Sequence, residues 1–176
     1  MGPRVECSLH RRGRSAVSVD PRDMGEPLIQ QDGLWLPIAD EPIEAFIAVL
    51  GDTKAGLYAG TEGHGVLRFS VADRAWHEAN VGLPTNEHVF VHDLLNLEGD
   101  LWAATSHGVF RLPGDSETWE GRNGPIADFY ATAIAASEEW LFAGTWEGRI
   151  FRSPDRGENW EQVYDHAMHG KSDRLP

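Results

Sequence analysis

Three short stretches of the sequence decide the fold: Leu57–Thr61 (LYAGT), Leu101–Thr105 (LWAAT) and Leu141–Thr145 (LFAGT). They follow one another at offsets of 44 and 40 residues. Self-similarity at a period of about 20–50 residues is typical of solenoids, propellers and other repeat arrays. The sequence therefore predicts a chain built from copies of one supersecondary unit.

A second pattern keeps nearly the same spacing. Two apolar residues and an arginine recur at Val66–Arg68, Val109–Arg111 and Ile150–Arg152, and a tryptophan follows each arginine eight residues later, at Trp76, Trp119 and Trp160. Trp35 lies 41 residues before Trp76, so a partial fourth unit begins the chain. Because two independent patterns agree, the repeat is not a chance similarity between short sequence segments.

Each unit has the composition of four short strands. Aromatic and β-branched residues gather in runs of strand length, and Gly, Asp, Asn and Pro stand between the runs. Four strands in 40–45 residues is the period of a β-propeller blade. We predict an all-β partial propeller with blades at 42–83, 86–124 and 128–164, a partial blade at 26–38, and innermost strands at Ala45–Leu50, His92–Leu97 and Tyr130–Ala135.

Composition limits the partners. The 176 residues hold 15 Lys and Arg against 28 Asp and Glu, a net charge of −13, so we expect neither nucleic acid nor an anionic membrane surface as partner. Five arginines fall within residues 1–25, which we expect to be a disordered basic arm, and residues 165–176 are expected to be a tail. A single cysteine, Cys7, excludes an internal disulfide framework and a zinc site of paired thiolates.

The targeting signals that would place the chain elsewhere are missing from the sequence as written. No run approaches the roughly 18 apolar residues of a membrane-spanning helix, and the N-terminal arginines are followed by Ser, Asp and Pro instead of an apolar segment. We expect a cytoplasmic protein. A misassigned or truncated N-terminus would allow secretion.

One stretch matches a specific motif. Ser153, Asp155, Gly157 and Trp160 fill every defined position of the Asp-box, S-x-D-x-G-x-x-W. With the repeats, this motif makes residues 28–164 resemble the bacterial neuraminidase-repeat (BNR, Asp-box) propellers, a superfamily that includes sialidases, sortilin-type receptors and photosystem assembly factors. The corresponding stretches Phe69–Trp76 and Leu112–Trp119 keep only the tryptophan.

The resemblance implies that the Asp-box is structural and lies on the face opposite the ligand site. The functional face would then carry the turns between second and third strands and the connections between blades. Candidate ligand-binding residues there are His64, His107, Trp146, Glu147 and Arg149. Two histidines without a set of carboxylates fall short of a metal site, so we predict no metal. An indole beside charges suits a sugar ring or a protein hot spot.

The sialidases of this superfamily suggest an alternative function. Arg68, Arg111 and Arg152 could imitate the arginine cluster that clamps a substrate carboxylate. They recur, however, at one strand position, as expected of architectural residues whose stems cover a sheet and whose heads pair with acids of the next blade. Tyr58 and Tyr130, the possible nucleophiles, fill ordinary repeat positions. We predict a non-enzymatic binding scaffold with no catalytic residues and no cofactor; the alternative is a sialidase-like glycoside hydrolase.

The number of blades leaves the ring open. Propellers close with about 4–8 blades, whereas this sequence supplies three and a part. The two end blades would each expose an apolar face, which favours association. The chain is therefore expected to be a fragment of a longer propeller or to associate with itself through its open edges, and to bind a protein or carbohydrate at the inter-blade loops.

Overall fold

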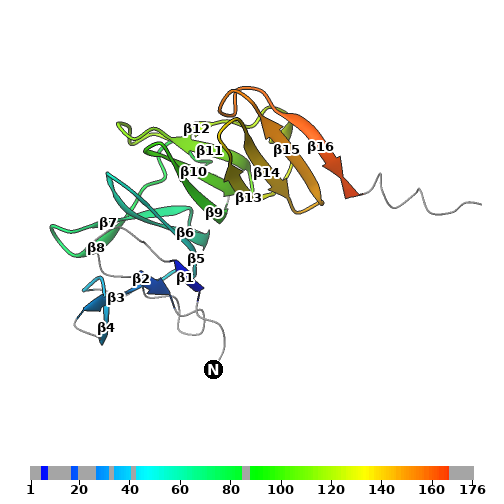
Figure 1. Cartoon of the computed structure of the whole chain (residues 1–176). Coiled ribbons are helices and arrows are strands. Elements are labelled where there is room, and N and C mark those ends of the chain that lie inside the picture. The colour runs from blue at the N-terminus through cyan, green and yellow to red at the C-terminus, as the bar shows by residue number, and fades with distance from the viewer. Residues whose placement is uncertain are drawn as a thin grey trace, which may run out of the picture.

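The computed structural model describes residues 5–7, 17–19, 27–31, 34–40, 43–84 and 88–166, and these residues form an open arc of antiparallel sheets (Figure 1). The predicted fold class, an all-β partial propeller of three four-stranded blades preceded by part of another, is confirmed. A short 3-10 turn, η1 (Gly124–Ile126), interrupts the strands. None of the described residues belongs to a helix long and apolar enough to cross a membrane.

The three blades are meanders in which each strand pairs with the next one along the chain. Blade 1 comprises β5 (Ile47–Thr53), β6 (Gly56–Gly63), β7 (Val66–Ser70) and β8 (Ala75–Glu78). Blade 2 comprises β9 (Val89–Leu97), β10 (Asp100–Thr105), β11 (Gly108–Leu112) and β12 (Glu120–Gly121). Blade 3 comprises β13 (Ala131–Ala136), β14 (Leu141–Thr145), β15 (Arg149–Ser153) and β16 (Glu161–Asp165).

The N-terminal region differs from the sequence-based expectation. The predicted hairpin of the partial blade is present as β3 (Pro27–Gln31) and β4 (Leu34–Pro37). The described parts of the expected disordered arm are strands β1 (Val5–Cys7) and β2 (Val17–Val19), which extend this hairpin into a four-stranded sheet. Apolar residues alternate in both segments, as expected of strands, and the basic composition hid this pattern; β2 pairs with β3, and β1 pairs with β2. Of the expected tail, residues 167–176 lie outside the described residues.

The innermost strand of blade 2 begins earlier than predicted. It starts at Val89 instead of His92, and pairs Glu62 with Phe90, which joins blades 1 and 2 at their inner edges. Each innermost strand also carries an irregularity at one repeat position, namely Ala48, His92 and Thr132. A bulge shifts the alternation of side chains by one residue, and in blade 2 it falls at His92, the residue at which the predicted strand begins.

Two hydrophobic clusters hold the blades together. Tyr58 and Val66 of blade 1 are buried against Val91, Leu101 and other residues of blade 2. Between blades 2 and 3 the second cluster brings together the following residues: Trp102, Ala104, Val109, Ile126, Ala131, Ile134, Leu141, Ala143, Phe151 and Trp160. A third, smaller cluster lies within blade 1, around Leu50, Ala59 and Leu67. The two larger clusters therefore place most of the core between blades.

The repeated tryptophans link successive blades by a hydrogen bond. Trp119 Nε1 donates to the carbonyl oxygen of Ala79 in blade 1, and Trp160 Nε1 donates to that of Arg122 in blade 2, each over 2.7 Å. Trp76 Nε1, at the same repeat position in blade 1, is buried but has no hydrogen-bond partner among the residues that the structure describes. The regular stacking of blades therefore extends from blade 1 to blade 3.

We predict that the three tryptophans contribute unequally to stability. Trp160→Phe removes a buried inter-blade hydrogen bond and should lower the free energy of unfolding by about 1–3 kcal/mol beyond the loss of ring volume. Trp76→Phe removes a similar volume but no hydrogen bond, and serves as the matched control. Urea unfolding of both variants measures the difference. Equal losses for the two would show that the indole N–H groups do not join the blades.

Candidate functional site

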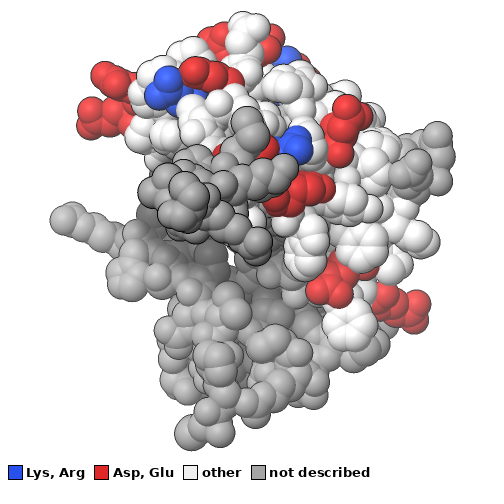
Figure 2. All heavy atoms as spheres, turned by 90° about the vertical axis from the view of Figure 1, so that its right-hand side faces the viewer, with Lys and Arg blue, Asp and Glu red and all other residues white. Residues whose placement is uncertain are grey.

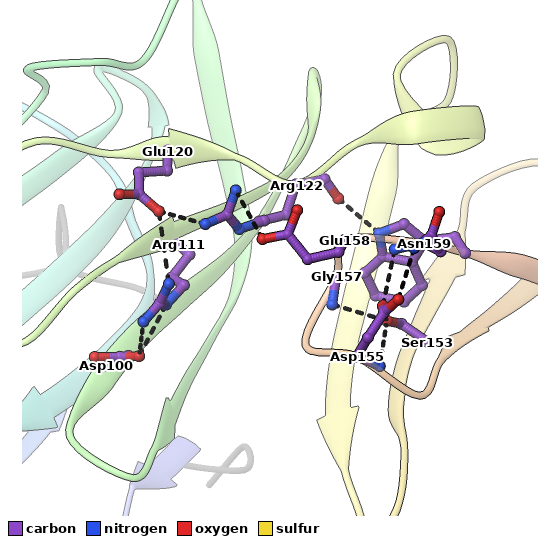
Figure 3. Close-up of polar contacts among 10 residues, drawn as sticks. Asp100, Arg111, Glu120, Arg122, Ser153, Asp155, Gly157, Glu158 and Asn159 are labelled. Carbon is purple, nitrogen blue, oxygen red and sulfur yellow. Dashed lines mark hydrogen bonds and ion pairs between the residues drawn. The ribbon is translucent and has the colours of Figure 1, made fainter.

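The Asp-box closes a hairpin between β15 and β16 (Figure 3). Ser153 Oγ accepts hydrogen bonds from the backbone N–H groups of Gly157 (2.8 Å) and Asp155 (3.3 Å), and donates to Asp155 Oδ1 (2.8 Å). Asp155 accepts from both the side chain and the backbone N–H of Asn159, and these bonds lower the pKa of its carboxyl group. Gly157 has a φ of 81°, which favours glycine. These hydrogen bonds hold the turn between β15 and β16.

Ser153 should be the most sensitive position of the Asp-box. Its side chain is 1% exposed and accepts two backbone N–H groups, so Ser153→Ala leaves both donors unsatisfied and should cost about 1–3 kcal/mol of unfolding free energy. Ser116 lies in the equivalent turn of blade 2 and accepts from one exposed N–H, that of Thr118. Thermal or urea unfolding of Ser116→Ala provides the control, for which we expect a smaller loss. A stability loss no greater for Ser153→Ala than for this control would contradict the structural role.

Charged side chains reinforce the same end of the blades. In Figure 3 an alternating series of acids and arginines runs from blade 2 to blade 3: Asp100, Arg111, Glu120, Arg122 and Glu158. The series ends on the residue that follows Gly157. We call this end of the blades the lower end. Its ion pairs and hydrogen bonds hold turns and neighbouring blades in place.

The repeated arginines are architectural, but their partners differ from the prediction. Arg111 pairs with Asp100 at 2.7 Å and Arg152 pairs with Glu161 at 2.9 Å, both within their own blades. Only Arg68 reaches an acid of the next blade, Glu117 at 3.8 Å. Antiparallel pairing places an acid of the neighbouring strand closer than any acid across the blade interface.

A different set of side chains occupies the upper end, where the innermost strands begin. Phe46, Phe90 and Tyr130 are 56%, 40% and 52% exposed. Their backbone carbonyl oxygens accept the N–H groups of Glu62, Ser106 and Trp146 in turn, each at 2.9 Å, so the three aromatic residues hold one position in the three blades. We call Phe46, Phe90 and Tyr130 the aromatic row.

The turns beside the aromatic row are held by buried threonines. Thr61 Oγ1 donates to the carbonyl oxygen of Gly65 (2.8 Å) and accepts the N–H of His64 (3.1 Å). Thr105 Oγ1 forms the same pair of bonds with Gly108 and His107, both at 3.0 Å. The recurring threonine of the LYAGT-type stretches thus fixes the upper turns, and gives the aromatic row a rigid surround.

Asparagines brace these turns from the connections between blades. Asn80 Oδ1 accepts the N–H of Val66 at 2.8 Å, and Asn123 Oδ1 accepts that of Val109 at 2.6 Å. Asn80 also donates through Nδ2 to the carbonyl oxygen of His64. The inter-blade connections, expected from the sequence to belong to the functional face, therefore begin with structural residues.

The two candidate histidines lie on equivalent turns of blades 1 and 2. His64 is exposed, whereas His107 is half-buried with Nδ1 3.0 Å from Ser106 Oγ. Within the part of the chain that the structure describes, no group of three or more His, Cys, Asp and Glu side chains is placed to hold a metal ion. The histidines can therefore contribute to a binding surface through hydrogen bonds and ring contacts.

Trp146, Glu147 and Arg149 fall into two groups. Trp146 is 80% exposed, and its backbone N–H donates to the carbonyl oxygen of Tyr130, so Trp146 lies next to the aromatic row at blade 3. Glu147 is exposed in the same turn. Arg149 instead stacks its guanidinium 4.2 Å from the ring centre of Phe129 and lies 3.5 Å from Asp165. The structure brings Trp146 and Glu147 to the surface and gives Arg149 a packing role.

We did not predict Phe46 and Phe90 as binding residues from the sequence, and we considered Tyr130 as the first residue of an innermost strand and as a possible nucleophile. The signal was present: Phe46, Phe90 and Tyr130 are separated by 44 and 40 residues, the offsets of the LYAGT-type stretches. The late start assigned to the innermost strand of blade 2 left Phe90 outside that strand and concealed the match.

The surroundings of the row differ from blade to blade. Each aromatic residue of the row is preceded, two positions earlier, by a polar residue, namely Glu44, His88 or Asp128. The residues whose backbone N–H groups bond to the row are Glu62, Ser106 and Trp146. Burial lowers the pKa of His92, on the inner strand beside the row, and the nearby Glu62 carboxylate partly offsets that shift. In such an arrangement the constant aromatic residues can supply affinity for a ligand, and the variable polar neighbours can supply specificity.

The fold and this site define the class of the protein as a partial β-propeller with an exposed aromatic row. No family model matches the chain, and no curated protein matches it either. Several solved structures match the chain. YCF48 bound to D1 peptide is 21% identical, with a TM-score of 0.62, and the match covers 85% of this chain and 50% of that one.

Two further neighbours have the same fold. YCF48 from Cyanidioschyzon merolae is 15% identical with a TM-score of 0.61, and the match covers 84% of this chain and 55% of that one. The extracellular domain of the putative one component system BT4673 from B. thetaiotaomicron is 14% identical with a TM-score of 0.70. The match covers 90% of this chain and 22% of that one. These likenesses establish the propeller fold. The chain spans about half the length of the YCF48 structures.

Proposed function

We propose that this protein is a non-enzymatic binding module of the Asp-box repeat type, and that it binds a segment of a protein partner along the aromatic row. The observation that carries the proposal is the exposure of Phe46, Phe90 and Tyr130 at one position of all three repeats. Repetition of a buried residue follows from packing. Repetition of an exposed aromatic residue has no packing reason, and large aromatic side chains dominate the energy of protein interfaces.

The surroundings of the row support binding with little rearrangement. Buried threonines and asparagines fix the adjacent turns, so few side chains need to be ordered on association. Trp146 adds a mostly exposed indole at one end of the row. The solved YCF48 neighbour is bound to D1 peptide, and the shared fold makes a peptide segment the first ligand class to test here. Carbohydrate binding through the same rings is the competing outcome.

The glycoside hydrolase alternative has less support from the site. A sialidase-like mechanism needs arginines that converge on a substrate carboxylate near the nucleophilic tyrosine. Tyr130 lies at the upper end of blade 3, whereas Arg111 and Arg152 make ion pairs with acids of their own blades. Their guanidinium groups are thus held away from any clamp around Tyr130.

The aromatic row can be tested with a library of random peptides displayed on phage, selected on the whole protein. We expect selected peptides to lose roughly 30-fold or more in affinity on Phe90→Ala or Tyr130→Ala, since a hot-spot residue contributes about 2 kcal/mol or more. Val71→Ala, which alters an 82% exposed residue in the β7–β8 turn at the lower end, is the control and should bind normally.

Two results would contradict the proposal. Selected peptides that bind the Phe46→Ala, Phe90→Ala, Tyr130→Ala triple variant as tightly as the original protein would place the binding surface elsewhere. Turnover of fluorogenic glycosides that is lost in Tyr130→Phe would establish the hydrolase instead. A glycan array probed in parallel shows whether the row prefers sugars to peptides.

A further inference from the structure

Glu62 is an exposed acid that lies between two members of the aromatic row. On one side its backbone N–H donates to the carbonyl oxygen of Phe46 over 2.9 Å, and on the other side it is paired with Phe90. Both contacts exist because β6 pairs with β5 in its own blade and, at Glu62 and Gly63, with β9 of the next blade. The link between blades 1 and 2 therefore holds Phe46, Glu62 and Phe90 side by side.

The strand register puts these three side chains on one face. Ile47 of β5 is paired with Thr61 of β6, so Phe46 and Glu62 lie opposite each other one residue further along. Directly opposite residues of antiparallel strands have side chains on the same face, with Cβ atoms about 4.5–5.5 Å apart. An exposed aromatic ring therefore flanks the Glu62 side chain on each side. We call Phe46, Glu62 and Phe90 the Phe–Glu–Phe triplet.

No lysine or arginine that the structure describes forms an ion pair with Glu62. Each arginine within residues 43–84 and 88–166 pairs with another acid: Arg68, Arg74, Arg111, Arg122, Arg149, Arg152 and Arg156. Lys54, in the turn between β5 and β6, lies at the opposite end of β6 from Glu62. Burial lowers the pKa of His92, and the nearby Glu62 carboxylate only partly offsets that shift, so this imidazole is uncharged at neutral pH. The Glu62 carboxylate is thus available to a cation of a ligand.

A carboxylate between two ring faces suits a ligand that carries an organic cation. The negative faces of aromatic rings attract Lys and Arg side chains, and a carboxylate adds a charge-assisted hydrogen bond. The apolar stem of such a side chain can also cover the rings. A sugar would contact the rings but would leave the charge of Glu62 unpaired.

Other exposed acids extend the negative charge along the row. Glu44 precedes Phe46 by two residues, Asp128 precedes Tyr130 by two, and Glu147 lies in the neighbouring turn of blade 3. Figure 2 shows the side of the molecule that carries blade 3 in Figure 1, and there the acidic groups are more numerous than the basic ones. A basic segment along the row would therefore meet acids at both ends.

We infer that the Phe–Glu–Phe triplet binds a lysine or arginine side chain, so that the aromatic row recognises a basic peptide segment. This inference rests on the proposed function and names the charge of its ligand. An acidic segment would be repelled by Glu62 and by the acids on either side of it.

NMR titration of the whole protein tests the cation site. The probe is Nα-acetyl-lysine methylamide. Its matched control is Nα-acetyl-norleucine methylamide, which has the same apolar stem without the ammonium group. We expect the lysine probe to shift the backbone amide signals of Phe46, Glu62 and Phe90, and the norleucine probe to shift them much less.

Three variants separate the contributions to binding of the lysine probe. Glu62→Gln removes the charge and should weaken binding about tenfold. Phe90→Leu keeps an apolar side chain but removes the ring face, and should weaken binding about threefold. Glu138→Gln removes the same charge from an exposed residue in the turn between β13 and β14, and should leave binding unchanged. Circular dichroism checks that each variant keeps its sheets.

The inference is overturned if the norleucine probe binds as well as the lysine probe, if neither probe shifts the triplet, or if Glu62→Gln binds lysine normally. The phage selection separates this inference from the proposed function. Selected peptides that need Phe90, but that bind Glu62→Gln unchanged and are not enriched in Lys and Arg, support the proposed function and overturn the cation site. Lysine binding at the triplet without any selected peptide supports the cation site and contradicts the proposed function.

Discussion

The packing of one blade face on the next is the constraint on which this structure depends. A single four-stranded sheet of this kind is apolar on both faces, and the two main clusters of buried residues lie between blades. Trp119 and Trp160 add a hydrogen bond across each of these interfaces. The same constraint explains why Tyr58 and Trp102, at one position of successive repeats, are both buried between blades.

The repeat separates structural positions from binding positions. Threonines in the upper turns, tryptophans in the outer strands and apolar residues on blade faces all recur because they are buried or hydrogen-bonded. Against this background the aromatic row stands out as a repeated position without a packing role. The lower end carries the Asp-box and its series of ion pairs, whereas the upper end carries the exposed aromatic row.

Much of the architecture could be predicted from the sequence because periodicity reports burial. The spacing of Trp76, Trp119 and Trp160 indicated three blades, and Ser153 accepts the N–H of Gly157 in the turn between β15 and β16. Bulges in the innermost strands broke the alternation and displaced the predicted start near His92, which hid Phe90. The partners of Arg111 and Arg152 could not be foreseen, since they depend on which acid the neighbouring strand places within reach. Likewise, the stacking of Arg149 on Phe129 became apparent only in three dimensions.

Amide hydrogen exchange of the whole chain tests the central claim, that packing between blade faces stabilises the structure, most directly. Residues of β10 in blade 2 belong to both of the main clusters, whereas those of β14 in blade 3 belong to one, so β10 should exchange much more slowly than β14. Equal protection of β10 and β14 would contradict the account, because the stability of a blade would then not depend on the clusters it shares with its neighbours.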